Sequence, residues 1–175
     1  MRQMRTVIRS MVMPSGSVVA MDDGTITWRP RHEKQRSCRI ESQASVMLGL
    51  MGPMGQIDRI VIGDVNGGVN IISLARMELA DRFVISESPI RSLCSCSMSG
   101  ESILAGCEDG GVYMLGPDVP GRTVGLFQLD GPASAIRVVG QSLHIQQGWE
   151  RKIVDWTGES TTFETPSFKP SLALA

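Results

Sequence analysis

The chain consists of short apolar stretches, many of them alternating with polar residues, separated by turns that contain Gly and Asp. Stretches of about four to eight residues that are rich in Val and Ile are typical of β-strands. No segment carries the longer 3.6-residue spacing of an amphipathic helix. The hydrophobic pattern therefore predicts an all-β protein.

One strand–turn–strand pattern recurs along the chain. Its first three copies occupy residues 18–28, 60–72 and 103–115, and a weaker fourth copy occupies residues 142–156. The turn glycines of the first three copies lie 43 residues apart, at Gly24, Gly67 and Gly110. Because Asp-Gly and Asn-Gly supply the positive φ angles of tight hairpin turns, we predict a hairpin with a positive-φ glycine in each copy.

Each hairpin has an apolar stretch before it and a more polar stretch after it. The preceding stretches are 7–12, 45–50, 90–96 and 135–139, and the following ones are 35–40, 82–86, 124–129 and 161–164. Four strands in a period of about 40 to 45 residues are typical of a β-propeller blade. An antiparallel β-sandwich is the alternative, because it also has regularly spaced short strands.

The prediction is a β-propeller of four four-stranded antiparallel blades. The expected blades are residues 7–41, 42–86, 87–130 and 131–165, between an N-terminal arm (1–6) and a C-terminal tail (166–175). Propellers have about four to eight blades. Four blades could therefore close as a ring, form half of an eight-bladed ring with a second chain, or be completed by another protein.

The third repeat resembles the WD40 repeat. The resemblance rests on its Ile90-Arg91-Ser92-Leu93 start, its Leu104-Ala105-Gly106 segment and its Glu108-Asp109-Gly110-Gly111-Val112 turn. The Gly-His and Trp-Asp dipeptides of that family are absent, although Trp156 lies near the Trp position. The resemblance implies a scaffold for protein–protein interaction with no chemistry of its own.

Charge is unevenly distributed along the chain. Basic residues outnumber acids by eight to three in residues 1–39, and acids outnumber basic residues by fifteen to nine in the rest. The densest basic segment contains the predicted partner-binding residues Arg29, Arg31, Lys34, Arg36 and Arg39. We expect this hairpin to contact an acidic protein surface, in a homodimer or in a protein partner.

The alternative is that the basic hairpin from Arg29 to Arg39 binds the phosphate backbone of a nucleic acid. We favour this less, because aromatic residues are not interleaved with the cations and the whole chain has a formal net charge of −1. No apolar run approaches the roughly 18 residues that cross a membrane. We therefore expect a cytoplasmic protein without a membrane partner.

Candidate chemistry is sparse. Cys94, Cys96 and Cys107 with His144 could supply zinc ligands, but their spacing is that of no zinc knuckle or ribbon, so we expect buried thiols and no metal. The chain has two histidines, neither in a catalytic signature, and no phosphate-binding loop. We expect no cofactor and no enzyme activity.

Methionine is concentrated in the first third of the chain. We expect four methionines on the predicted innermost strands to fill the core, namely Met11, Met13, Met47 and Met51.

Overall fold

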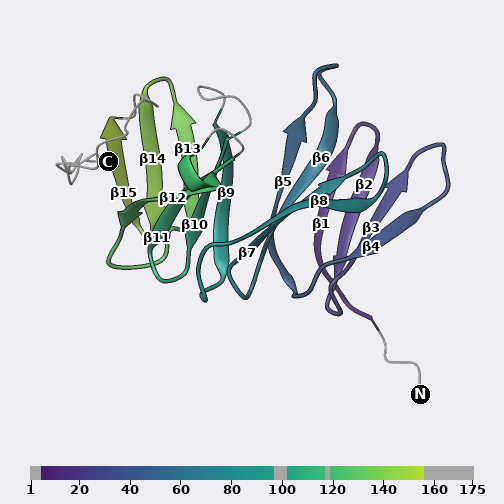
Figure 1. The fold of residues 1–175 in the computed structure, drawn as a ribbon, viewed down its shortest axis with the longest axis horizontal. Coiled ribbons are helices and arrows are strands. Elements are labelled where there is room, and N and C mark those ends of the chain that lie inside the picture. Colours follow the sequence, from purple (N-terminus) through teal and green to yellow (C-terminus); the bar gives the residue numbers. More distant parts are fainter. Residues whose placement is uncertain (1–4, 97–101, 117–118, 156–175) are drawn as a thin grey trace. The chain divides into compact units, whose positions relative to one another are not determined.

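A computed structural model describes residues 5–96, 102–116 and 119–155 of this chain (Figure 1). These residues form antiparallel strands in four sheets, in which strands adjacent in sequence pair with one another. The first sheet contains β1 (Val7–Met13), β2 (Gly16–Met21), β3 (Thr25–Pro30) and β4 (Arg36–Arg39). The second contains β5 (Ala44–Met51), β6 (Ile57–Asp64), β7 (Gly68–Ser73) and β8 (Glu78–Val84).

The other two sheets follow in the same order. The third contains β9 (Ile90–Cys96), β10 (Ser102–Cys107), β11 (Gly111–Leu115) and β12 (Thr123–Gln128), with the short 3-10 helix η2 (Pro120–Arg122) before β12. The fourth contains β13 (Ala135–Val139), β14 (Ser142–Gln147) and β15 (Glu150–Asp155). The all-β prediction is confirmed, with fifteen strands in the described residues.

One predicted strand differs from the structure in its start, and another lies outside the described residues. Strand β8 begins at Glu78, four residues before the expected start, because Glu78 and Leu79 pair with the end of β7 although their side chains are exposed. The fourth strand expected for the last sheet, residues 161–164, lies outside the described residues. In the described part of the chain the last sheet has three strands.

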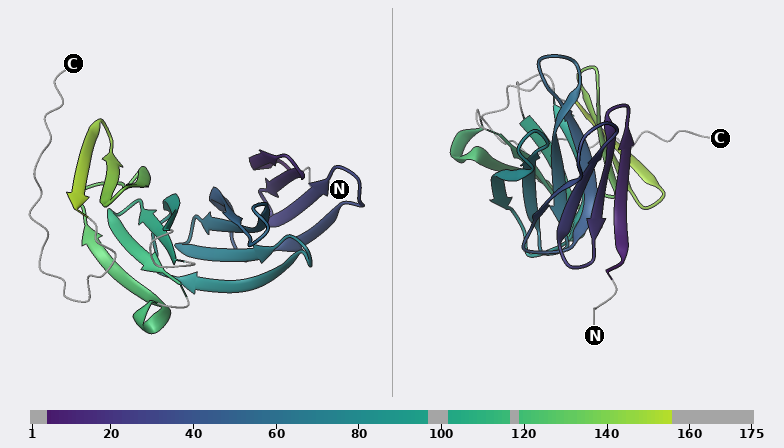
Figure 2. Two further views of the ribbon diagram at one scale, coloured as in Figure 1. Left: turned by 90° about the horizontal axis from the view of Figure 1, so that it is seen from above. Right: turned by 90° about the vertical axis from the view of Figure 1, so that its right-hand side faces the viewer.

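The chain divides into two compact units, residues 1–90 and 91–175. In the first unit, the strands of β1–β4 and β5–β8 form two twisted sheets (Figure 2). Apolar side chains of these two sheets form one core. Its fully buried members include Val18, Ile26, Ile60, Ile62 and Ile72. These residues alternate along their strands, so one face of each strand packs against the neighbouring sheet.

The second unit has its own core between the sheets β9–β12 and β13–β15. Leu104 and Val112 from one sheet pack with Leu143 and Ile145 from the other, and all four are fully buried. Each unit thus contains a pair of sheets with apolar facing surfaces.

The predicted turn glycines lie in equivalent turns. Gly24, Gly67 and Gly110 have φ angles of 80°, 77° and 90°, the positive values that the sequence predicts. A Cβ atom at each position would lie under 3.0 Å from a backbone oxygen of the residues that follow the outer strand. Glycine is therefore required both by the left-handed backbone and by the close approach of that segment.

The fourth turn is built differently. Gln147 pairs with Glu150, which leaves Gly148 and Trp149 as a two-residue turn, and Gly148 has a φ of 57°. Trp149 is fully exposed at this tip. The missing Asp-Gly pair in the fourth repeat therefore corresponds to a shorter hairpin.

Side chains on the first strands of three sheets form hydrogen bonds to backbone carbonyls far along the chain. Arg9 Nε donates to the Ser45 carbonyl at 2.7 Å, and Ser45 Oγ lies 2.5 Å from the Ile90 carbonyl. Ser92 Oγ donates to the Ala133 carbonyl at 2.7 Å and is buried. Each bond joins residues that are 36 to 45 positions apart in the chain.

The methionine prediction holds for three of four residues. Met13 is buried, and Met11 and Met47 pack against the first core. Met51 is 62% exposed, because it lies at the end of β5, just past an irregularity in the pairing with β6. The expectation of a core position was wrong there.

Candidate interaction surfaces

The β3–β4 hairpin carries the five predicted partner-binding residues, and strand alternation separates them. Arg36 pairs across the strands with Trp28, a residue of the first core. Its guanidinium forms an ion pair with Glu33 at 3.0 Å and donates a hydrogen bond to the Ala75 carbonyl in the turn after β7. Arg36 is therefore used to hold the hairpin against the second sheet.

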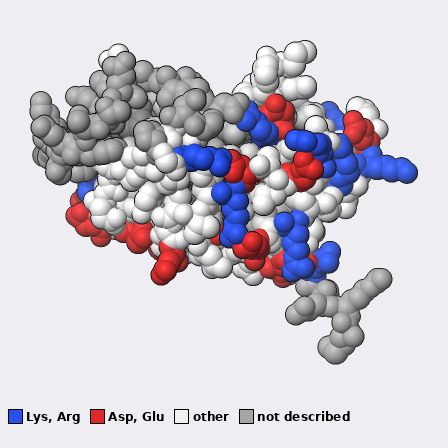
Figure 3. Space-filling model, in the orientation of Figure 1, with Lys and Arg blue, Asp and Glu red and all other residues white. Residues whose placement is uncertain are grey.

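The remaining four cations point elsewhere. Arg29 and Arg39 lie on the β1–β4 face that is turned away from β5–β8, and Arg31 and Lys34 lie in the connecting loop. All four side chains are exposed. With the acids that the structure describes, Arg29, Arg31 and Lys34 form no ion pair. Lys and Arg side chains are prominent over the first unit in this view (Figure 3).

Arg39 has a partial role inside its own sheet. The pKa of the Asp23 carboxyl is below its usual value because of hydrogen bonds from Thr25, the positive charge of Arg5 and, as the smallest of these effects, the positive charge of Arg39. The exposed cationic surface available to a partner is therefore formed by Arg29, Arg31 and Lys34, which we call the basic hairpin surface, with Arg39 at its margin.

The aromatic residue of this hairpin is not available for stacking. Trp28 is 5% exposed and packs in the first core. A single-stranded nucleic acid site usually combines cations with exposed aromatic rings on which bases stack. The described part of the hairpin has the cations without such a ring.

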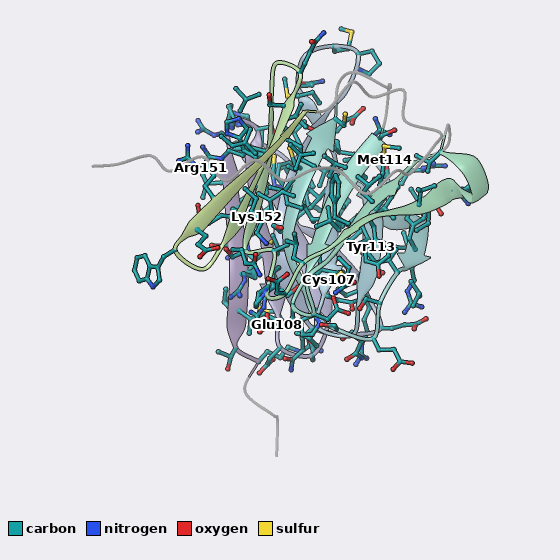
Figure 4. The ribbon with its side chains drawn as sticks, turned by 90° about the vertical axis from the view of Figure 1, so that its left-hand side faces the viewer. Cys107, Glu108, Tyr113, Met114, Arg151 and Lys152 are labelled. Carbon is teal, nitrogen blue, oxygen red and sulfur yellow. The ribbon has the colours of Figure 1, made fainter. Side chains whose placement is uncertain are left out.

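A second cationic surface, which no sequence pattern indicated, lies on the last sheet. A cavity of about 420 Å³ is lined there by Arg137, His144, Gln146 and Arg151, together with apolar residues of β13. Arg151 and Lys152 are consecutive on β15 and so project to opposite faces (Figure 4). Only the strand register brings these residues together, since no sequence motif links them.

On the β13–β15 face turned away from β9–β12, the described side chains include Arg137 and Arg151. Strand alternation also puts Asp155, which pairs with Ser142, on this face.

The candidate zinc ligands do not form a metal site in the described residues. Cys94 is half-buried and Cys96 is buried, both against the second core, and Cys107 is buried. Among the residues described, no group of three or more His, Cys, Asp or Glu side chains could hold a metal ion. His32 lies exposed in the loop between β3 and β4. No helix within these residues is long and apolar enough to cross a membrane.

Comparison with known proteins identifies a fold and no family. No family model matches the chain, and no curated protein matches it. The computationally designed Ika4 protein is similar in structure, with a TM-score of 0.70 and 12% identity over 88% of this chain and 93% of that one. The designed Ika8 protein has a TM-score of 0.66 and 13% identity, over 87% of this chain and 46% of its own.

These likenesses concern the fold alone, since the identities are so low. The chain spans less than half the length of Ika8.

Proposed function

We propose that this chain is a non-catalytic protein-interaction module with a WD40-like β-propeller architecture. In this proposal each sheet is one blade, and the module binds an acidic surface of a protein partner through the basic hairpin surface. The partner is either another protein or a second copy of the chain, which would make a homodimer. The WD40-like architecture is supported by the repeated sheets and turns, and the binding mode by the charge of the hairpin.

The repeated architecture is compatible with propeller blades. Four antiparallel sheets follow one another, and three contain the same positive-φ glycine turn. Facing surfaces within each unit are apolar, as stacked blades require. A module of this kind presents mainly loops to a partner, and the basic hairpin surface lies partly on such a loop.

The observation that carries the proposed binding mode is the set of exposed cations in the β3–β4 hairpin that form no ion pair with the acids the structure describes. Arg29, Arg31 and Lys34 are exposed and form no ion pair with a described acid, whereas the neighbouring Arg36 is paired with Glu33. Exposed cations of one sign steer an oppositely charged partner and add specificity to its docking. A protein is favoured as the source of the acidic surface, because Trp28 is buried and offers no stacking platform to bases.

The proposal is tested with two variants of equal charge change. The first is Arg29→Gln/Arg31→Gln, which reduces the basic hairpin surface. The second is Arg137→Gln/Arg151→Gln, which removes two exposed cations from the other unit. Proteins captured from native extract by the wild-type chain are compared quantitatively with those captured by each variant, and the mass of the purified chain is measured by light scattering at low and high salt.

A partner retained by the second variant and lost by the first supports the proposal. A dimer that dissociates at high salt and in the first variant identifies the partner as a second copy. Equal capture by all three proteins would contradict the proposed surface. Salt-dependent binding of generic RNA or DNA that is lost in the first variant would replace the protein partner with a nucleic acid.

A further inference from the structure

The face of the β13–β15 sheet turned away from the second core gathers polar side chains into two rows. Arg137, His144 and Ile153 lie opposite one another across the three strands. Ala135, Gln146 and Arg151 form the neighbouring row in the same way. The alternate residues, including Leu143 and Ile145, face the core. The rows therefore form one surface, and the cavity of about 420 Å³ lies over it.

The two arginines of this surface have no acidic partner among the side chains that the structure describes. Arg137 and Arg151 are exposed, and the cavity lining includes no Asp or Glu. Lys152 shows the contrast, because it lies on the other face of β15 and within 4.0 Å of Asp130. Among the described side chains, the lysine on one side of the strand is paired with an acid, and the two arginines on the other side form no ion pair.

The position of the arginines suits a shared anion. They lie on β13 and β15, which are about 10 Å apart because β14 separates them. Two guanidinium groups that border one cavity repel each other, and an anion held between them removes that repulsion. A guanidinium also binds the two oxygens of a carboxylate or phosphate in a paired, planar geometry.

The rest of the lining extends this chemistry. The Gln146 amide and the His144 imidazole are half-buried. Gln146 Nε2 donates one hydrogen bond to the Gly148 carbonyl at 2.7 Å and carries a second N–H, which can bind a further oxygen, as can an N–H of His144. Ala135 and Val139 add apolar wall, and Val139 is 53% exposed. A cavity of this volume lies within the usual range of small-molecule sites, about 300–1,000 Å³.

We propose that this face of the β13–β15 sheet is a binding site for a small organic anion that carries a carboxylate or phosphate group. Arg137 and Arg151 bind the charged group, Gln146 and His144 orient it, and the apolar residues of β13 contact its carbon skeleton. This site lies in the other unit from the basic hairpin surface and is independent of the proposed partner.

The test is a titration of the full chain, at low salt, with three probes: inorganic phosphate, succinate and adenosine monophosphate. Binding is followed by NMR shifts and by calorimetry, in the wild type and in Arg137→Gln, Arg151→Gln and the double variant. The variant Arg29→Gln/Arg31→Gln is the control with the same loss of charge as the double variant. Melting curves of all variants show whether each is folded.

We expect saturable binding of at least one probe, with the largest NMR shifts on β13, β14 and β15. Each single variant should weaken binding about tenfold, since one charge-assisted contact is lost, and the control should leave it unchanged. Preference for succinate or for the phosphate probes identifies the charged group. No saturable binding of any probe, or equal weakening by the control, would overturn the proposal.

Discussion

The amide nitrogen Nδ2 of Asn70 donates a hydrogen bond to Oδ2 of Asp64 at 3.0 Å, and both residues are buried. The other carboxylate oxygen of Asp64 accepts backbone N–H bonds from Asn66 and Gly68, each at 2.9 Å. Asp64 ends β6 and Asn70 lies on β7, so this network closes the glycine turn of the second sheet. A buried carboxylate with this many donors fixes the turn geometry and is costly to remove.

Replacing Asp64 by Ala should lower the free energy of unfolding by about 2–4 kcal/mol, because three donors lose their acceptor. Chemical denaturation of the wild type and the variant measures this difference. The control is Asp58→Ala at the start of β6, where the carboxylate is 42% exposed and pairs with Arg59. That change should cost less than about 1 kcal/mol. Equal losses in the two variants would show that the buried Asp64 network stabilises the fold no more than the Asp58–Arg59 ion pair does.

Replacing Gly110 by Val should destabilise the third sheet by about 3 kcal/mol. The left-handed backbone accounts for about 1–2 kcal/mol of this, and the clash with the Leu129 carbonyl accounts for the rest. Gly140→Val separates the two effects, because Gly140 has a φ of 59° and a Cβ atom added there would meet nothing within 4 Å. We expect the control to lose only the backbone part. Equal shifts in melting temperature for Gly110→Val and Gly140→Val would contradict a clash between the new side chain and the Leu129 carbonyl.

Replacing Ser92 by Ala should cost about 1–2 kcal/mol, since the buried Ala133 carbonyl loses the hydroxyl donor at 2.7 Å. Ser134→Ala is the matched control, because Ser134 Oγ also donates to a carbonyl, that of Gln146, but in an exposed position. Its loss should stay below about 0.5 kcal/mol. Denaturant midpoints of the two variants, measured at equal slope, test the difference. If Ser92→Ala leaves the stability unchanged, the hydrogen bond from Ser92 to Ala133 contributes nothing to the stability of the second unit.

The pH dependence of stability should carry a contribution from Asp23. Hydrogen bonds from Thr25, with Arg5 and Arg39 nearby, hold the pKa of its carboxyl below the usual 3.8. Because its pKa is lower in the folded state, the Asp23 carboxylate stabilises the folded state at pH values above the ordinary pKa of 3.8. This stabilisation is lost as the pH falls below 3.8 and through the pKa of the folded state.

Melting temperatures of Asp23→Asn measured between about pH 6 and pH 2.5 should therefore fall less steeply with acid than those of the wild type. The variant Asp130→Asn, at a carboxylate that is 93% exposed, serves as the comparison. If the melting temperatures of the wild type and Asp23→Asn fall equally with decreasing pH, the hydrogen bonds to this carboxyl do not lower its pKa.

The Cys38 thiol should react slowly with iodoacetamide. Burial raises its pKa above the ordinary 9.0, which reduces the fraction of reactive thiolate at neutral pH. Site-resolved mass spectrometry should find Cys38 modified more slowly at about pH 8 than in the denatured chain, with a rate that still rises above about pH 9. A rate equal to that of the denatured chain would show that the thiol is not shielded.

Much of the local structure could be predicted because short-range rules govern it. The strand pattern and the positive φ of Gly24, Gly67 and Gly110 depend on alternation and on turn sterics within a few residues. Met51 and the start of β8 were predicted wrongly, because strand ends depend on the pairing partner and on exposure. The candidate surfaces were harder still, since Arg36 looked equivalent to Arg29 until the pairing register placed it against the second sheet.

The sequence by itself determined an all-β chain of repeated hairpins, because alternation and glycine turns act locally on the backbone. Tertiary structure decided which face each strand turns to its neighbour, and therefore which charges are used internally and which are exposed. Arg137 and Arg151 lie fourteen positions apart with no motif between them, and only the register of β13, β14 and β15 places them over one cavity. Register depends on contacts between strands, and a linear pattern does not contain them.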